Sequence, residues 1–366
     1  MYSKELSSIK KSNRFRTREI FSKDIIDLAS NDYLGLSTNK DIFQKAYERV
    51  LKEQYTSPKA SMLVNGYNQI HKDFEDLLCK TNKFQAGVAV GSGFLANIAM
   101  IEALCRKNDT LFIDEDYHAS GILATKLLKP EQVVVFKHND SLDLENKILQ
   151  NTRSGRNIVA IEGVYSMGGD LAPIELFHIQ EKYNTLLLVD EAHSSGVIGD
   201  NLLGIFDHYK IKPNKYHIKM GTLGKAYGSY GAYILASNEI IDFLVNRAKP
   251  IIYSTAPSLF DIALGFESLK YIIENKKTLK EKINENLTII RTILGIKSNS
   301  LIIPIDIGDN KKVKQIQAVL QEKSYLVGAI RQPTVKSAII RLIAKIDINE
   351  NDLTKVCQVL KELKWE

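Results

Sequence analysis

The chain has 366 residues, longer than one average domain, and its composition of 44% hydrophobic and 25% charged residues with eight prolines is that of a globular protein without long disordered stretches. Its formal net charge of +6 comes from 49 basic and 43 acidic residues spread through the same segments, so no basic arm for nucleic acid stands out. Three scattered cysteines and no CxxC spacing exclude a disulfide framework and a zinc knuckle, and we expect a reducing, cytoplasmic setting. A charged N-terminus and the absence of any run of about 18 apolar residues predict no signal peptide and no membrane span.

Short apolar, β-branched runs alternate with segments of helical length over the first two thirds of the chain. This alternation predicts an α/β fold, with mostly parallel strands joined by crossover helices. The runs are 87–90, 111–113, 133–136, 158–161, 186–189 and 231–235. Beyond about Phe260 the pattern changes to long Lys/Glu/Asn-rich helices, a strand at 301–307 and an amphipathic helix at 351–363. We therefore expect an N-terminal segment (1–38), a large domain (39–260) and a smaller C-terminal α/β domain (261–366).

The loop after the first run joins a strand to a helix. It extends from Gly91 to Ala96 and formally matches the GxGxxA pattern of dinucleotide-binding proteins, with Asp114 following at the distance of a ribose-binding carboxylate. Physically, such a loop brings backbone N–H groups and a helix N-terminus to one point, where any phosphate would be stabilised. A nicotinamide-dependent dehydrogenase, a phosphate ester site and a tight turn without ligand all stay open at this point.

An aspartate and a histidine follow the apolar run 186–189. Asp190 ends the run and His193 comes three residues later, so both are delivered to the edge of the sheet where ligands bind. The letters DEAH also occur in helicases, but no GxxxxGKS/T loop precedes them, so an NTPase is excluded. No compact HxxxH spacing supports zinc. A buried structural ion pair remains the alternative.

Lys225 is set among small residues between two strand-like segments. Glycines around it let a planar ligand approach its side chain, and a lysine that forms an imine needs such a shielded site. Taken alone, it could be a surface-loop lysine. Together, a phosphate loop, Asp190, His193 and Lys225 predict a pyridoxal 5'-phosphate site, in which the aspartate keeps the pyridine nitrogen protonated so that the ring accepts electrons.

These motifs resemble those of the α-oxoamine synthases, which are fold-type I pyridoxal phosphate enzymes. The resemblance covers most of the chain and rests on Ser30 to Leu36, Gly93 to Asn97, His118 to Ser120, Glu162 to Met167, Asp190 to His193, Gly221 to Lys225, Tyr253 to Thr255 and Arg331 to Val335. It implies an aspartate aminotransferase-like fold and a homodimer. One segment departs from the family, because 56–61 is TSPKAS where relatives have a glycine-rich run, so its backbone should differ locally.

The resemblance also implies a role for each site residue. Lys225 would carry the cofactor and remove the Cα proton, His118 would stack on the ring, Asp190 would pair with the pyridine nitrogen, and His193 and Ser166 would bind the phenolic oxygen. Gly93, Phe94 and Thr222 would hold the phosphate, Glu162 would line the site, Thr255 would reach the partner's phosphate, and Arg331 and either Arg14 or Arg16 would face substrate. No metal is implied.

The implied activity is condensation of an amino acid with an acyl thioester. Arginine before Pro-Thr-Val favours the branch that joins L-alanine to a pimeloyl thioester, on coenzyme A or acyl carrier protein, with loss of CO2 in biotin biosynthesis. The alternatives are glycine or serine with an acetyl, succinyl or palmitoyl thioester. More remote ones are an NAD-dependent dehydrogenase and a non-catalytic binding protein.

Overall fold

The computed structural model describes residues 1–12 and 14–364 of the chain. It divides into two compact units. The larger unit comprises Leu34–Ser166 and Asp170–Lys280, and the smaller comprises Met1–Tyr33, Met167–Gly169 and Glu281–Glu366, of which 365 and 366 are not described. The predicted domain boundaries at 38/39 and 260/261 stay a prediction, since contact grouping alone does not define them.

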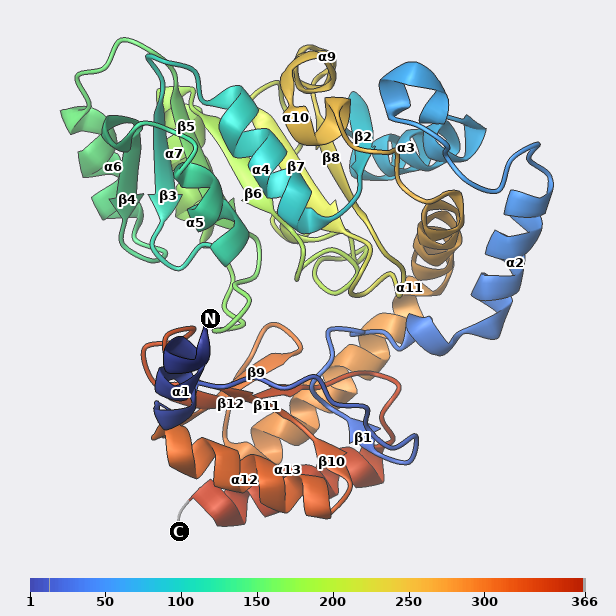
Figure 1. The fold of residues 1–366 in the computed structure, drawn as a ribbon, viewed down its shortest axis with the longest axis vertical. Coiled ribbons are helices and arrows are strands. Elements are labelled where there is room, and N and C mark those ends of the chain that lie inside the picture. Colours follow the sequence, from blue (N-terminus) through green and yellow to red (C-terminus); the bar gives the residue numbers. More distant parts are fainter. Residues whose placement is uncertain (13, 365–366) are drawn as a thin grey trace. The chain divides into compact units, whose positions relative to one another are not determined.

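A seven-stranded sheet forms the centre of the larger unit (Figure 1). Its strands, in spatial order, are β2 (Ala86–Val90), β8 (Ala232–Ala236), β7 (His217–Thr222), β6 (Leu186–Asp190), β5 (Asn157–Glu162), β3 (Thr110–Asp114) and β4 (Val133–Phe136). The neighbours from β7 to β4 are parallel, whereas β8 runs antiparallel to both β7 and β2. The predicted, mostly parallel sheet is therefore confirmed, and antiparallel pairs occur at the edge that ends in β2.

Helices cover both faces of this sheet because its strands are apolar on both sides. The larger unit has short 3-10 or π turns at η1 (Leu36–Thr38), η2 (Met62–Gly66) and η3 (Pro130–Gln132). Its α-helices are α2 (Lys40–Leu51), α3 (Gln69–Asn82), α4 (Gly93–Leu104), α5 (Ala119–Thr125), α6 (Ser141–Gln150), α7 (Ile174–Tyr183), α8 (Ile205–His208), α9 (Asn238–Arg247) and α10 (Lys249–Ile252). Figure 1 shows α4 and α5 on one face, where they share a core with α9 and α10. The long helix α11 (Leu259–Leu294) begins in this unit and ends in the smaller one.

The smaller unit combines two short sheets with helices. The strands are β1 (Ile26–Asp27), β9 (Ile302–Gly308), β10 (Tyr325–Leu326), β11 (Gly328–Ile330) and β12 (Ala338–Ile343), and the helices are α1 (Ser3–Lys11), α12 (Asn310–Glu322) and α13 (Glu350–Lys364). Strands β11, β12 and β9 form an antiparallel sheet, and β1 pairs in parallel with β10. The predicted C-terminal strand and amphipathic helix are confirmed as β9 and α13. No helix in the described part of the chain is long and apolar enough to cross a membrane.

The segment 56–61, where the sequence lacks the glycine run of its relatives, includes a residue in left-handed conformation. Lys59 has φ +65°, a conformation that glycine adopts at least cost. The next carbonyl, Ala60 O, accepts from the backbone N–H of Ala256, 3.0 Å away, which ties this segment to the residue that follows 253–255. Lys59 thus adopts, at some conformational cost, a turn conformation that glycine would adopt without strain.

Candidate active site

A cavity of about 200 Å³ opens at the carboxyl ends of three neighbouring parallel strands in the larger unit. Strands β5, β6 and β7 end at Glu162, Asp190 and Thr222, and all three residues line it. The other lining residues are Gly93, Phe94, Asn97, His118, Ser120, Ala192, His193, Met220 and Lys225. This edge is where ligands bind in open α/β sheets, because backbone N–H groups of the following helices and loop side chains converge there.

Most residues singled out from the sequence come together in this cavity. Eight of the twelve line it: Gly93, Phe94, His118, Glu162, Asp190, His193, Thr222 and Lys225. Ser166 lies beside it, since its backbone N–H donates to Glu162 Oε2 at 3.2 Å. Thr255 is exposed and does not line the cavity, and Arg14 and Arg331 belong to the smaller unit.

One end of the cavity is the beginning of α4. Ser92 caps this helix, because its Oγ accepts from the backbone N–H of Leu95 at 3.3 Å, and the first-turn residues Gly93 and Phe94 line the cavity. Thr222 lies across from Gly93, and a Cβ added to Gly93 would stand 3.7 Å from Thr222 Cβ, filling the space between them. A helix N-terminus facing a threonine across such a gap is a cradle for a phosphate group.

A hydrogen-bond network holds the carboxylate of Asp190. Oδ1 accepts from the backbone N–H of Ala192 at 2.9 Å, and Oδ2 accepts from Asn97 Nδ2 at 2.8 Å. The amide of Asn97 also donates to Ser120 Oγ at 2.9 Å and accepts from the Tyr117 hydroxyl at 2.7 Å. These contacts orient the carboxylate and leave lone pairs on both oxygens for a further donor.

His118 belongs to the same network through Ser120. Its Nδ1 lies 2.7 Å from Ser120 Oγ, and it caps α5 by accepting from the Ser120 backbone N–H. Burial lowers the pKa of His118, and this effect, helped by the positive charge of Lys225, outweighs the opposing negative charge of Asp190. The ring is therefore neutral at neutral pH, which favours packing against a planar aromatic ligand.

Lys225 and Glu162 are two further ionisable residues of the cavity. Lys225 Nζ lies 2.7 Å from His193 Nε2, so a proton can pass between the amine and the imidazole. Burial raises the pKa of Glu162 well above its usual range, and the negative charge of Asp190 raises it further. The raised pKa keeps this carboxyl protonated at neutral pH. Its Oε1 is buried without a hydrogen-bond partner, so it can still form a hydrogen bond with a ligand.

Comparison with known proteins assigns the fold and the family. The family model of aminotransferase class I and II matches residues 23–360. The chain belongs to the aminotransferase class I and II family. A Helicobacter pylori (strain J99) protein named 8-amino-7-oxononanoate synthase is 43% identical over 98% of this chain and 96% of its own. This likeness confirms the resemblance to α-oxoamine synthases.

Solved structures confirm the fold-type I architecture. A serine palmitoyltransferase from S. paucimobilis with bound PLP superposes with a TM-score of 0.89, at 20% identity, over 99% of this chain and 98% of its own. A Francisella tularensis structure named 8-amino-7-oxononanoate synthase has a TM-score of 0.76 at 25% identity, over 94% of this chain and 99% of its own. The predicted aspartate aminotransferase-like fold is therefore confirmed.

The residues of this family member fit pyridoxal phosphate. The cradle at Gly93 and Thr222 suits its phosphate, the Asp190 carboxylate suits a protonated pyridine nitrogen, and Lys225 suits its aldehyde carbon. Glu162 Oε1, buried and unpaired, offers one more hydrogen bond to a ligand. A volume of about 200 Å³ suits one small ring and lies below the ~300–1,000 Å³ of pockets for drug-sized ligands.

Asp114 does not have the position that a dehydrogenase requires. It is fully buried, and its oxygens accept from the backbone N–H of Asn139 at 2.9 Å and from the Tyr165 hydroxyl at 2.8 Å, with His138 Nδ1 also 3.0 Å away. Because it does not line the cavity, it cannot bind a ribose there. The GxGxxA match is therefore not accompanied by the ribose-binding carboxylate of a dinucleotide site.

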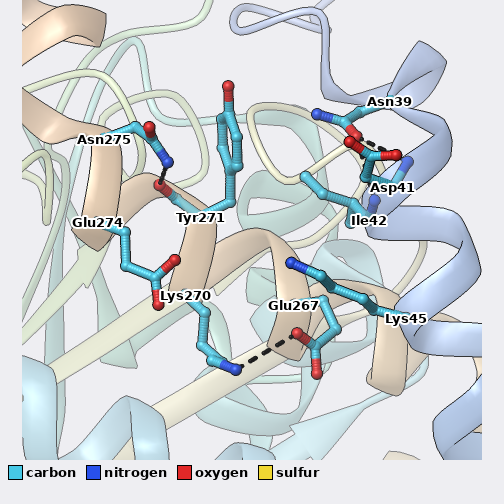
Figure 2. Close-up of a pocket in the computed structure, with 9 residues that line it drawn as sticks. All are labelled: Asn39, Asp41, Ile42, Lys45, Glu267, Lys270, Tyr271, Glu274 and Asn275. Atoms are coloured by element: carbon cyan, nitrogen blue, oxygen red, sulfur yellow. Dashed lines mark hydrogen bonds and ion pairs between the residues drawn. The ribbon is translucent and has the colours of Figure 1, made fainter.

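A second cavity of about 290 Å³ lies between α2 and α11 (Figure 2). Its lining includes both acids and bases, among them Glu267, which pairs with Lys270 at 3.6 Å and with Arg49 at 3.1 Å. Among the described residues, no group of His, Cys, Asp and Glu could hold a metal ion here or elsewhere.

Two residues that hold the site together, Asn97 and Ser120, received no role from the sequence. Both occur within motifs that carry the family resemblance, but a single Asn or Ser on a helix shows no spacing that marks it. One signal was available, because Asn97 interrupts a run of apolar residues in α4, and a polar side chain inside an apolar helix needs a buried partner.

Proposed function

We propose that this chain catalyses the condensation of L-alanine with a pimeloyl thioester, using pyridoxal phosphate and yielding 8-amino-7-oxononanoate, CO2 and the free thiol carrier. A bond forms between the alanine Cα and the acyl carbonyl carbon, the thiol leaves, and the alanine carboxylate departs as CO2. One structural observation carries the proposal: Lys225 Nζ lies 2.7 Å from His193 Nε2, in a cavity that Asp190 also lines. The name of the full-length relatives specifies which α-oxoamine synthase reaction this site performs.

The ionisable residues of the cavity each have a part in this reaction. When bound, pyridoxal phosphate supplies an electron sink that stabilises negative charge at the amino acid Cα. Asp190 holds the proton on the pyridine nitrogen, which that electron sink requires. Lys225 takes the Cα proton and returns one after CO2 has left, and His193, at 2.7 Å, keeps the amine in place. Glu162, protonated because it is buried, donates a hydrogen bond into the cavity without adding a second negative charge.

The phosphate and the ring are held by the remaining residues. Gly93, Phe94 and Thr222 receive the phosphate at the α4 N-terminus, and His118 packs its neutral ring against the cofactor. Ser166 and His193 bind the phenolic oxygen. Arg331, with its planar guanidinium, and Arg14 bind substrate carboxylates. The acyl group is carried by coenzyme A or acyl carrier protein.

The working enzyme is a cytoplasmic homodimer in this proposal. Several large apolar side chains of the larger unit are exposed, namely Phe43, Tyr47, Leu63, Val64, Phe94, Tyr230 and Tyr253. Exposed apolar side chains of this size are candidates for burial against a second subunit, and one of them, Phe94, also lines the cavity. In this proposal the exposed Thr255 reaches the phosphate bound in the partner subunit.

The test is an absorption spectrum of the purified protein with added pyridoxal phosphate, before and after borohydride. Wild type should show a band at the edge of the visible range, and borohydride should attach the cofactor irreversibly. Lys225→Ala should lose both, whereas Lys80→Ala, an exposed lysine on α3, should retain both and so control for surface labelling. Absence of the band in wild type would refute the proposal.

Amino acid profiling decides between this reaction and its nearest alternative. Turnover of alanine with pimeloyl thioester supports the proposal. Turnover of glycine or serine, with an acetyl, succinyl or palmitoyl thioester, would assign the chain to another α-oxoamine synthase branch. The fold alone does not separate these branches, since a serine palmitoyltransferase superposes on most of the chain.

A further inference from the structure

His138 lies between two carboxylates, outside the cavity. Its Nδ1 is 3.0 Å from Asp114 Oδ1, and its Nε2 is 2.8 Å from Asp170 Oδ2. Asp116, 4.0 Å from Nδ1, and Glu115, whose Oε1 accepts from the His138 backbone N–H at 3.4 Å, add negative charge around the ring. A histidine that binds a carboxylate at each nitrogen must donate from both, and only the imidazolium form can do so.

The two carboxylates are themselves tied to neighbouring groups. Asp114 Oδ2 accepts from the Tyr165 hydroxyl at 2.8 Å, and the Tyr165 ring meets the His138 ring edge to face at 4.4 Å between centroids. Asp170 Oδ2 also accepts from Asn139 Nδ2 at 2.7 Å. We call the set His138, Asp114, Asp170 and Tyr165 the imidazolium clamp.

The clamp holds both arms of a hairpin-like excursion, residues 163–172, that follows β5. Tyr165 N–H donates to Asp170 O at 2.9 Å, an isolated bridge joins Val164 to Leu171, and Ala172 N–H donates to Gly163 O at 3.3 Å. One arm therefore carries Tyr165 and the other carries Asp170, and each side chain belongs to the clamp.

This excursion is joined directly to the cavity. At its start, the Gly163 N–H donates to Asp190 O at 2.8 Å, and near its tip the Ser166 N–H donates to Glu162 Oε2 at 3.2 Å. Glu162 lines the cavity and is the last residue of β5. The position of its carboxyl thus depends on where the clamp holds residues 163–166.

We propose that His138 is a positioning residue, which through the clamp and the excursion 163–172 sets the carboxyl of Glu162 and the backbone of Ser166 for the cofactor. This rests on the proposed function, since it presumes pyridoxal phosphate in the cavity. His138 itself is not among the residues that line the cavity.

The electrostatics of the clamp support this role. Burial by itself would lower the pKa of His138, but hydrogen bonds to Asp114 and Asp170 and the charges of both outweigh burial and raise the pKa to about 10. The ring therefore remains doubly protonated throughout the neutral range and binds both carboxylates there.

The test measures the dissociation constant of pyridoxal phosphate from holoenzyme variants, together with the absorption maximum of the bound cofactor. His138→Gln should bind the cofactor at least about tenfold more weakly, a loss within the range of interaction free energies measured between residues of one hydrogen-bond network. It should also shift the absorption maximum of the bound cofactor in the same direction as Glu162→Gln does. In the double variant, the fold loss in cofactor affinity should be smaller than the product of the fold losses in the two single variants, because both changes act on one carboxyl. His178→Gln, at an exposed position of α7, is the matched control and should bind as wild type does.

The outcomes separate this inference from the proposed function. If wild type binds the cofactor and His138→Gln binds it equally well with an unshifted spectrum, or if the two losses multiply, His138 is merely structural and the inference is wrong. If wild type binds no pyridoxal phosphate, the proposed function fails and the inference falls with it. Should His138→Gln not fold, Asp170→Asn, which changes the half-exposed end of the clamp, undergoes the same comparison and carries the same two outcomes.

Discussion

Asn97 connects three residues at the candidate site, although the sequence assigned it no role. Its amide contacts Asp190, Ser120 and Tyr117, and it is almost fully buried. No spacing rule finds such a residue, because its importance comes from residues 20 to 93 positions away along the chain.

Replacing Asn97 by Leu should weaken cofactor binding and stability together. The change leaves the Tyr117 hydroxyl without its acceptor and Asp190 Oδ2 without a donor, and an unsatisfied buried polar group costs about 1–3 kcal/mol. Urea unfolding and cofactor titration measure the two effects. Asn246→Leu, exposed on α9, should change neither, and wild-type behaviour of Asn97→Leu would show that the network is dispensable.

Lys219 is an almost completely buried lysine in β7. Its Nζ lies 3.4 Å from Glu191 Oε1 and donates to Asn82 Oδ1 at 2.9 Å. Lys219→Met leaves Glu191 as a buried carboxylate without its cation, and removal of one partner of a buried pair destabilises by about 3–5 kcal/mol. Denaturant unfolding should show this loss, and Lys219→Met/Glu191→Gln should recover part of it.

The exposed pair Lys182 and Glu145 gives the matched control for this comparison. These side chains lie 2.6 Å apart at the surface, where solvent screens them, so Lys182→Met should leave the free energy of unfolding unchanged within measurement. An equal loss in both variants would mean that burial does not decide the effect.

At the scale of elements, the clamp connects β3 to the excursion after β5 and makes stability depend on pH. The folded pKa of His138 is raised to about 10, above an unfolded value of ~6.5, so its contribution is complete below ~6.5 and is lost as pH rises through 10. Urea unfolding should show that the free energy of unfolding of wild type falls between pH 7 and 10.5, and that it falls less in His138→Gln. If the free energy of unfolding fell equally in wild type and in His138→Gln, His138 would not be the group that titrates.

The strands of the larger unit were largely predictable, because buried parallel strands are uninterrupted apolar runs. All six predicted runs correspond to strands, from β2 to β8. Strand β7 was not among them, because its sequence, His217-Ile218-Lys219-Met220-Gly221-Thr222, alternates polar and apolar residues although Lys219 is buried. The antiparallel direction of β8 was not predictable either, since an apolar run has the same pattern in both directions.

Residues of the site were predictable when a motif marks chemistry and not when a residue only supports it. Lys225, Asp190, His193 and His118 were found because an amine, a carboxylate and imidazoles after strands suggest catalysis. The dehydrogenase alternative could be set aside only from structure, because the sequence does not show that Asp114 binds His138, Asn139 and Tyr165. Arg331 and Arg14 keep their predicted roles as proposals.

For the whole molecule, cofactor binding should raise resistance to heat. A ligand that binds only the folded state stabilises it by RT ln(1 + [L]/Kd), about 2.7 kcal/mol at 100 times Kd. Thermal unfolding of wild type should therefore shift upward with added pyridoxal phosphate, and Lys225→Ala should shift less, because it lacks the attachment point. Equal shifts would mean that binding does not involve Lys225.

The pairing of β1 with β10 also determines when the protein can finish folding as it leaves the ribosome. Ile26 pairs with Tyr325, so this strand pair needs residues from both ends of the chain. Residues 34–280, apart from Met167–Gly169, form a unit of their own, which can begin to fold during translation. Strand β1 must therefore wait for its partner until the ribosome has synthesised β10, long after β1 itself has emerged.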